Sequence, residues 1–330
     1  MEQYKSLRSR IINLDDKDFP EVALRIFQYQ AKGNSIYSEF LGHLGVEPAQ
    51  VKHWRDIPFL PIELFKAQKV TTGQWPTDVV FNSSGTGGAP SKHYIRDLEF
   101  YHQISAGTFN RFYGSLSQYH LFALLPGYQE NQSSSLISMV QHFIESTDTS
   151  YSGFYLDDHR QLMEQMHRAH EEGTRKVLLW GVSFALMDLA ESYSLNIPGL
   201  VVMETGGMKG RRPEITRDQL HHTLQKAFAV EAVHSEYGMA ELSSQAYAVE
   251  RGLFHLPPWM RVVVRELDDP LYDAPYGRTG RINIIDLANL HSCAFIATQD
   301  IGIMKPEGSF LILGRMDNSE VRGCNLMLEA

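Results

Sequence analysis

The spacing of apolar residues changes along the chain and divides it into three stretches. Residues 1–50 carry apolar side chains at helical spacing, interrupted at Leu14-Asp15-Asp16 and at Gly33-Asn34-Ser35, which predicts helices separated by two breaks. From about residue 78, short apolar runs alternate with amphipathic segments. In the last eighty residues, strand-like runs follow one another with Asp-Pro, Tyr-Gly and Glu-Gly turns between them.

The central stretch predicts strands alternating with helices, and therefore a parallel or mixed sheet with helices on its faces. The predicted strands are residues 78–81, 120–125, 176–181, 200–204 and 232–234, and Ser183 is a candidate cap for the helix after the third. Ligands bind beyond the carboxyl ends of strands in such sheets. Polar loops at 82–93, 181–184, 205–207 and 235–241 follow strand ends, which predicts a shared site.

The last stretch predicts an antiparallel ribbon or small barrel with strands at 261–265, 280–285 and 309–313. We therefore expect an α/β protein in three parts. These parts are a helical segment (residues 1–55), an α/β core (56–255) and an antiparallel β subdomain ending in a hinge tail (256–330).

Composition narrows the function classes. A net charge of −9 without a basic tail argues against a nucleic-acid binder. Two cysteines, Cys293 and Cys324, make no disulfide framework and fit a reducing compartment. No signal peptide is visible, and the longest apolar run, residues 177–187, is too short to span a bilayer. We expect a cytoplasmic protein.

The loop Asn82-Ser83-Ser84-Gly85-Thr86-Gly87-Gly88-Ala89-Pro90-Ser91-Lys92-His93 carries the most informative chemistry. Its glycines and small hydroxyl residues offer exposed N–H groups and hydroxyl donors beside a cation, as a polyphosphate requires. Glycine also lets the main chain approach a ligand closely. Taken alone, the loop could equally be an ordinary turn.

Three further motifs follow in order: His234-Ser235-Glu236-Tyr237-Gly238-Met239-Ala240-Glu241, Thr298-Gln299-Asp300-Ile301-Gly302 and Gly314-Arg315-Met316-Asp317. Together with the loop, they resemble the adenylate-forming superfamily of acyl-CoA synthetases, luciferases and phenylacetate–CoA ligases. The run from Ile57 to Lys66, IPFLPIELFK, narrows the resemblance to acyl-protein synthetases of the LuxE type, which activate fatty acids for bacterial bioluminescence. The resemblance begins near residue 50. It implies the large N-terminal domain of the adenylate-forming fold, with mixed sheets flanked by helices and a small antiparallel β subdomain.

The resemblance implies that the glycine-rich loop binds the phosphates of ATP. The residues in question are Ser83, Ser84, Gly85, Thr86, Gly87, Gly88 and Ser91. Ser91 stands where the superfamily usually has a lysine, and Lys92 follows one position later. Lys92 or His93 could supply the missing charge, so both are candidate catalytic residues.

The later motifs supply the other implied ligand contacts. Glu241 corresponds to the glutamate that holds Mg²⁺, and one carboxylate suffices when phosphate oxygens and waters complete the shell. Asp300 corresponds to the aspartate that binds the ribose hydroxyls, and Arg315 to an arginine near the ribose and phosphate. The remaining predicted nucleotide contacts are Gly206 and Gly207 at the adenine turn, Tyr237 with Gly238 against the adenine or acyl group, and the adjacent Glu236 and Met239.

The C-terminal tail departs from the superfamily. Adenylate-forming enzymes continue past the Gly-Arg-x-Asp hinge into a mobile domain with a catalytic lysine, whereas only Asn318 to Ala330 follow here, so we expect this domain to be missing and adenylation to be slow or partner-dependent. Cys324 resembles the acyl-accepting cysteine of LuxE-type synthetases, and Arg322 would favour its thiolate. The alternative is an inert cysteine in a frayed tail. Cys293 is expected in the core.

We therefore expect an enzyme that uses ATP and Mg²⁺ to activate a carboxylic acid, a fatty acid, as acyl-AMP. Cys324 would take the acyl group and pass it to a partner such as an acyl reductase or carrier protein. The alternatives are an acyltransferase that does not adenylate and a non-catalytic nucleotide- or acyl-binding regulatory subunit. Glu164, His167 and His170 have metal-like helical spacing but are expected on a solvated face, as is the pair His221-His222.

Overall fold

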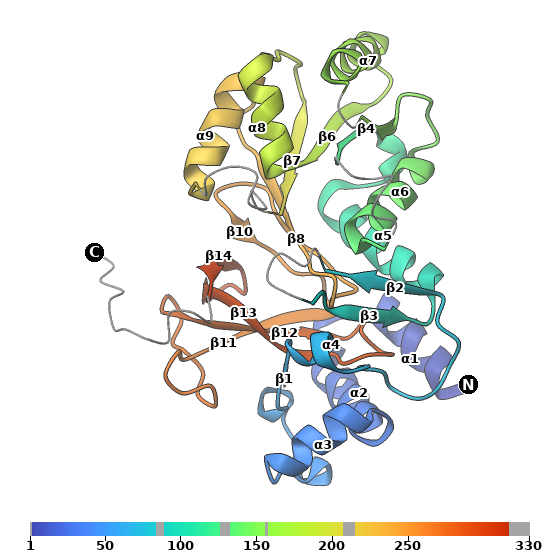
Figure 1. Cartoon of the computed structure of the whole chain (residues 1–330), viewed down its shortest axis with the longest axis vertical. Helices are drawn as coiled ribbons and strands as arrows, with labels where there is room; N and C mark the ends of the chain where they lie inside the picture. Colours follow the sequence, from blue (N-terminus) through green and yellow to red (C-terminus); the bar gives the residue numbers. More distant parts are fainter. Residues whose placement is uncertain (1, 84–88, 126–132, 156–157, 207–214, 317–330) are drawn as a thin grey trace.

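The computed structural model describes residues 2–83, 89–125, 133–155, 158–206 and 215–316. The molecule is elongated, with an α/β sheet at one end, an antiparallel sheet in the middle and the N-terminal helices at the other end (Figure 1). Among the helices of these ranges, none combines the length and apolarity needed to cross a membrane.

The N-terminal segment forms the predicted helices with the predicted breaks. They are α1 (Glu2–Ile12), α2 (Phe19–Gly33) and α3 (Ser35–His43). Asn34 ends α2 and caps α3, because its side-chain oxygen accepts a hydrogen bond of 3.0 Å from the backbone N–H of Tyr37. The apolar face of α2, including Val22, Ile26 and Phe27, packs into one hydrophobic core with the antiparallel sheet.

The α/β sheet has the strand order β5-β4-β6-β7-β8-β9, parallel except for β9. Its strands are β4 (Tyr119–Leu124), β5 (Gly153–Phe154), β6 (Lys176–Val182), β7 (Val201–Thr205), β8 (His234–Tyr237) and β9 (Ala246–Ala248). The covering helices are α5 (Leu98–Tyr113), α6 (Ser135–Thr147), α7 (His159–Glu172), α8 (Ser183–Ser192) and α9 (Arg217–Phe228), with α8 and α9 on one side and α5 and α6 on the other (Figure 1). Strand β4 is buried throughout, as expected for a parallel strand covered on both faces. The predicted alternation of strands and helices is confirmed for the strands at 120–125, 176–181, 200–204 and 232–234, whereas the predicted strand at 78–81 is wrong as a member of this sheet, because it pairs with residues 92–95 in a separate hairpin.

The second sheet is antiparallel, with the order β10-β14-β13-β12-β11, and β1 adds to β13 in parallel. Its strands are β1 (Leu60–Pro61), β10 (Leu253–Phe254), β11 (Met260–Arg265), β12 (Thr279–Asp286), β13 (Phe295–Met304) and β14 (Phe310–Arg315). The three predicted strands correspond to β11, β12 and β14. Strand β13 was not predicted, because Thr298, Gln299 and Asp300 interrupt its apolar pattern.

Gly302 has a packing role within β13. A Cβ atom at this position would lie 2.1 Å from the backbone oxygen of Leu311 and 2.5 Å from Cδ1 of Ile282. The register between β13 and β14 shifts at this point. The glycine of the Asp-Ile-Gly motif is therefore required by close packing against neighbouring strands.

A separate hairpin of β2 (Val79–Asn82) and β3 (Lys92–Ile95) lies between the two sheets (Figure 1). The short helix α4 (Leu64–Ala67) precedes it and lies beside β3. Phe65 of α4 is buried and meets the ring of His93 edge-on at 5.9 Å. Phe81 of β2 and Ile95 of β3 belong instead to the core of the α/β sheet, so the hairpin packs against both parts of the molecule.

Strand β9 separates two hydrophobic cores. Tyr247 belongs to the α/β core, where its ring lies 6.2 Å from that of Trp180, whereas Ala246 and Ala248 belong to the second core. This follows from the alternation of side chains along a strand. The second core joins the N-terminal helices to the antiparallel sheet, and the predicted boundaries at residues 55 and 255 stay a prediction.

Asp286 fixes the chain segment that leads into β9. Its carboxylate accepts hydrogen bonds from the backbone N–H groups of Ser243 (2.9 Å) and Ser244 (2.8 Å) and from the Ser244 hydroxyl (2.7 Å). Asn289 assists, because its side chain accepts from the N–H of Ser243 (2.9 Å) and donates to the backbone oxygen of Glu241 (2.7 Å). The end of β12 thus positions the segment after β8.

We expect Asp286→Ala to lower the free energy of unfolding by about 3 kcal/mol, because it removes the acceptor of the buried N–H groups of Ser244 and Ala288 and of the Ser244 hydroxyl, whereas the N–H of Ser243 keeps Asn289. Urea denaturation followed by circular dichroism measures this loss. Asp268→Ala, at an exposed aspartate of the same sheet's β11–β12 connection, is the control and should change stability by less than about 0.5 kcal/mol. Equal effects of the two substitutions would contradict the anchoring role of Asp286.

Candidate functional site

The hairpin holds the base of the predicted phosphate loop. The backbone N–H of Ser83 donates to the oxygen of Ser91 (3.1 Å), and the N–H of Ser91 donates to Oγ of Ser83 (3.0 Å). The loop residues Ser84, Gly85, Thr86, Gly87 and Gly88 lie outside the described residues. The two predicted phosphate contacts at the ends of the loop are thus placed side by side.

Ser91 connects this hairpin to Glu241. Its hydroxyl donates to Oε1 of Glu241, and both side chains are buried. Among the described residues, no arginine or lysine forms an ion pair with Glu241, and its buried side chain accepts a hydrogen bond from the neutral Ser91 hydroxyl. A buried carboxylate without a cation favours the binding of one.

Lys92 and His93 point to opposite faces of β3, so they cannot act in the same place. The Lys92 side chain is exposed. The ring nitrogens of His93 are bonded to the backbone oxygen of Ala240 (Nδ1, 2.9 Å) and to Oγ of Ser292 (Nε2, 2.8 Å). Burial lowers the pKa of His93 to about 4, so the ring is neutral at pH 7. Both catalytic roles stay predictions, and the contacts of His93 favour a positioning role next to Glu241.

Asp300 lies opposite Arg315 on β13 and β14. Its Oδ2 accepts a hydrogen bond of 2.7 Å from the Tyr237 hydroxyl, and its Oδ1 accepts one of 3.1 Å from Nε of Arg315. Burial, with the charge of Asp300, raises the pKa of Tyr237, which therefore donates as a neutral phenol. A carboxylate has about four acceptor positions, so Asp300 retains capacity for hydroxyl donors.

The predicted site residues converge on one region. Glu241 and Asp300 both act electrostatically on Tyr237 and on Arg315. Thr205, which precedes Gly206, pairs with Glu236 in the sheet, so the Gly206 turn lies beside the Tyr237 turn. Met239 is half-buried and packs into the second core. Gly207 and Cys324 lie outside the described residues.

Glu236 is a buried acid at the centre of this region. Its Oε2 accepts a hydrogen bond from the Thr205 hydroxyl. Burial raises the pKa of Glu236 to about 7, and the negative charge of Glu204 acts in the same direction. A Cβ on residue 238 would lie 2.5 Å from Oε1 of Glu236, so Gly238 makes room for this carboxyl group.

Sequence reasoning missed a second set of polar residues beside the Gly206 turn. His221 was expected on the surface, but this prediction is wrong: it is buried, with Nε2 3.5 Å from Oε1 of Glu204. Ser183 does not cap α8, where Val182 is the N-cap residue. Its hydroxyl instead contacts the backbone oxygen of Gly206 (2.6 Å) and Oε2 of Glu204 (3.1 Å). The available signal was Glu204, a carboxylate within an apolar strand.

No group of three or more histidine, cysteine, aspartate or glutamate side chains in the described ranges is arranged to hold a metal ion. Glu164 and His167 are exposed, and Glu164 pairs with Arg160 at 3.2 Å, which confirms the solvated face predicted for this helix. Glu241 as a single carboxylate fits Mg²⁺, which keeps several waters and takes phosphate oxygens as further ligands.

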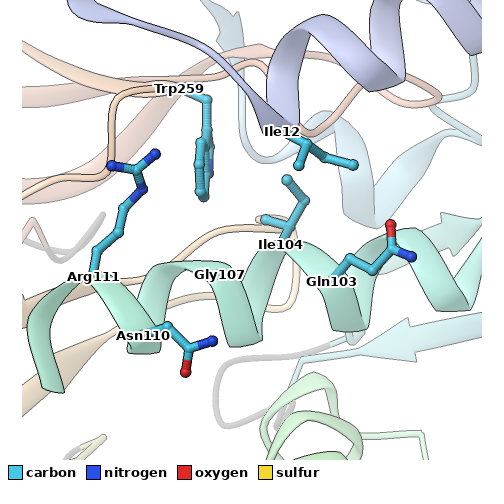
Figure 2. Close-up of a pocket in the computed structure, with 7 residues that line it drawn as sticks. All are labelled: Ile12, Gln103, Ile104, Gly107, Asn110, Arg111 and Trp259. Carbon is cyan, nitrogen blue, oxygen red and sulfur yellow. The ribbon is translucent and has the colours of Figure 1, made fainter. Parts of the chain in front are cut away.

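A separate pocket of about 280 Å³ lies between α1, α5 and Trp259, away from these residues (Figure 2). Ile12 and Ile104 face each other on one side of it, and the guanidinium of Arg111 lies 5.3 Å from the Trp259 ring on the other. Its remaining lining residues are Gln103, Gly107 and Asn110. None of the predicted site residues lines it.

Comparison with known proteins agrees with the motifs. Residues 173–330 match the family model of LuxE, described as acyl-protein synthetase. Over 349 aligned residues the chain is 22% identical to the long-chain-fatty-acid–luciferin-component ligase of Vibrio harveyi, covering 99% of this chain and 89% of that protein. The chain is LuxE-like. The resemblance inferred from the sequence is confirmed.

Solved structures similar to the LuxE-like chain are adenylate-forming enzymes. They include ATP-bound MatB from Rhodopseudomonas palustris (18% identity, TM-score 0.56, 72% of this chain and 48% of that one). MenE from Bacillus subtilis with ATP and magnesium gives 17% identity and a TM-score of 0.52 over 73% of this chain and 50% of that one. An open 2-hydroxyisobutyryl-CoA ligase gives 13% identity and a TM-score of 0.69 over 92% of this chain and 71% of that one. The predicted adenylate-forming fold is confirmed, and the chain spans about half the length of MatB and MenE.

We expect Glu236→Gln to stabilise the protein at alkaline but not at acidic pH. Because the folded state raises the pKa of Glu236 from 4.5 to about 7, the stability that its proton provides is complete below pH 4.5 and is lost as the pH rises through 7. The free energy of unfolding of the variant relative to the parent should therefore rise by about 3 kcal/mol between pH 4 and pH 8.

Urea unfolding across this pH range tests the shift. Glu250→Gln, at an exposed glutamate, is the matched control and should show a pH-independent difference. A flat difference for Glu236→Gln as well would mean that the buried acid is ionised at neutral pH.

Proposed function

We propose that the LuxE-like chain activates a fatty acid with ATP and Mg²⁺ and transfers the acyl group to a cysteine and then to a partner protein. The observation that carries the proposal is the meeting of the Ser91–Glu241 pair with the Tyr237–Asp300–Arg315 cluster around one region. This region is where the ends of the glycine-rich loop also lie.

Each side chain has a defined task in this proposal. Glu241 binds Mg²⁺, since it is a buried carboxylate that forms no ion pair with an arginine or lysine among the described residues. Asp300 accepts hydrogen bonds from the ribose hydroxyls, held in place by Tyr237 and Arg315. The N–H groups of the loop, with Ser83 and Ser91 at its base, bind the phosphates. Gly206 and Gly207 border the adenine.

The first step is the attack of a carboxylate oxygen of the acid on the α-phosphorus of ATP. The bond from this phosphorus to the bridging oxygen breaks, and pyrophosphate leaves with the electron pair, which yields acyl-AMP. His93 is unprotonated and Tyr237 keeps its proton at pH 7, so neither side chain brings a charge to this region, whereas Glu241, Asp300 and Arg315 do. Positioning and charge stabilisation are therefore the contributions of this chain.

The second step requires a thiolate, and Cys324 is the proposed acceptor. Its sulfur attacks the acyl carbonyl carbon, AMP leaves, and a thioester forms, from which the acyl group passes to a partner such as an acyl reductase or carrier protein. Cys293 is unsuited to this role, because it is fully buried and burial raises its pKa to about 12.

We expect pyrophosphate release that depends on the added acid, which distinguishes adenylation from acyl transfer without ATP and from a regulatory binding subunit. Glu241→Gln should lower kcat by about 10²–10³-fold, because a charged group that stabilises the transition state is lost. Asp300→Asn should raise KM for ATP about tenfold, because one charge-assisted hydrogen bond to the ribose is lost.

A coupled pyrophosphate assay over fatty acids of several chain lengths measures both effects, and Glu164→Gln, at an exposed glutamate of α7, is the control. Acid-independent pyrophosphate release, or full activity of Glu241→Gln, would count against the proposal.

We expect the intact mass of the protein to increase by one acyl group after incubation with ATP, Mg²⁺ and the preferred acid. The adduct should be released by hydroxylamine, should be absent from Cys324→Ala and should persist in Cys293→Ala, since the latter removes a buried thiol. If Cys324→Ala still gains the mass of one acyl group, the acyl group is attached to a residue other than Cys324.

A further inference from the structure

Glu204 is a buried carboxylate at the carboxyl end of β7, directly before Thr205 and Gly206. Burial by itself would raise its pKa, but hydrogen bonding with His221 and the charge of Arg217 outweigh burial and lower it. Nε of Arg217 lies 3.5 Å from Oε1 of Glu204. The carboxylate is therefore ionised, and His221 and Arg217 together stabilise its charge.

The same arginine also reaches the antiparallel sheet. Its guanidinium lies 5.2 Å from the centre of the Phe254 ring on β10, and one terminal nitrogen donates to the backbone oxygen of Ile312 on β14 at 3.4 Å. It fills the space above Gly252, where a Cβ would lie 3.0 Å from Cδ of Arg217. The Arg217 side chain thus spans from the α/β sheet to the antiparallel sheet.

The two ends of this bridge lie next to two parts of the proposed nucleotide site. On one side, the Ser183 hydroxyl contacts both Glu204 and the backbone oxygen of Gly206, where the chain turns with φ of 69°. On the other side, Ile312 precedes Arg315 in the same strand, and Arg315 bonds to Asp300. Arg217 therefore connects the turn proposed for adenine to the strand behind the proposed ribose contact.

We propose that Arg217 is a positioning residue that fixes the separation between the Gly206 turn and β14, so that adenine and ribose are bound together. It acts through Glu204 and Ile312, and the inference rests on the proposed function. A lysine cannot replace it, because only the planar guanidinium can pair with a carboxylate, donate to a carbonyl and lie against an aromatic ring at the same time.

The test separates neutralisation of Glu204 from positioning. Arg217→Met removes the arginine from the buried Glu204 carboxylate and leaves it only the contacts with His221 and Ser183, so the variant should unfold at a lower urea concentration than the parent. The double variant Arg217→Met with Glu204→Gln removes both charges and should recover most of this loss. Its Kd for ATP, measured by calorimetry, should nevertheless stay about tenfold weaker than that of Glu204→Gln alone, the cost of lost positioning.

Three further measurements make the outcome decisive. Arg217→Lys should keep stability within the range of the parent but show the weakened ATP binding, whereas Arg160→Met, at an exposed arginine, should change neither. If the double variant binds ATP as tightly as Glu204→Gln, Arg217 only neutralises Glu204 and the inference is wrong. Amide hydrogen exchange of residues 310–315 without nucleotide should be faster in the double variant, and unchanged exchange would show that no bridge exists.

This exchange measurement also separates the inference from the proposed function. A parent protein that binds no ATP contradicts the proposed function, whereas the exchange of β14 reports on the bridge whether or not ATP binds.

Discussion

The Asp286 carboxylate accepts several buried hydrogen bonds, and the arrangement of the site depends on them. The segment from Glu241 to Ser244 has no strand partner of its own in the described contacts, yet its N–H groups are buried and need acceptors. Asp286 and Asn289 supply these acceptors from the end of β12. The position of Glu241 is therefore set by the antiparallel sheet, although Glu241 follows a strand of the α/β sheet. The site belongs to the junction of two sheets, and neither sheet alone would create it.

The three carboxylates at this junction differ in how their charge is balanced. An oxygen of Glu204 lies 3.5 Å from Nε of Arg217, and an oxygen of Asp300 lies 3.1 Å from Nε of Arg315. Among the described residues, Glu241 instead accepts a hydrogen bond from the Ser91 hydroxyl. Glu236 is protonated over much of the pH range below 7 and adds no fourth charge there. Within the part of the chain that the structure describes, Glu241 is thus the member of this set without an ion pair, which supports its proposed role as a cation ligand. This distribution agrees with the similarity to LuxE and with the adenylate-forming fold.

Features that depend on residues close together in the sequence could be predicted. The N-terminal helix breaks at Asn34, the continuously apolar strands β4 and β6, and the order of the four motifs all follow from local pattern. The failures share one cause, which is contact between distant segments. His221 reads as a surface residue until Glu204 is placed against it, and Ser183 reads as a cap until the Gly206 turn lies beside it. Strand β13 was missed because it places polar Thr298 and Asp300 in buried positions, where Ile282, Tyr237 and Arg315 bond to them.

Strand β9 carries a large side chain toward one core and two small ones toward the other. Because interiors are close-packed, any added volume at Ala246 or Ala248 must displace backbone that also carries Tyr247. Substitutions that change side-chain size on one face of β9 therefore affect the packing of both cores. Across diverging homologues, we expect residue size on the two faces of β9 to covary, so that an alignment would link positions of the α/β lobe with positions of the N-terminal helices that never touch them.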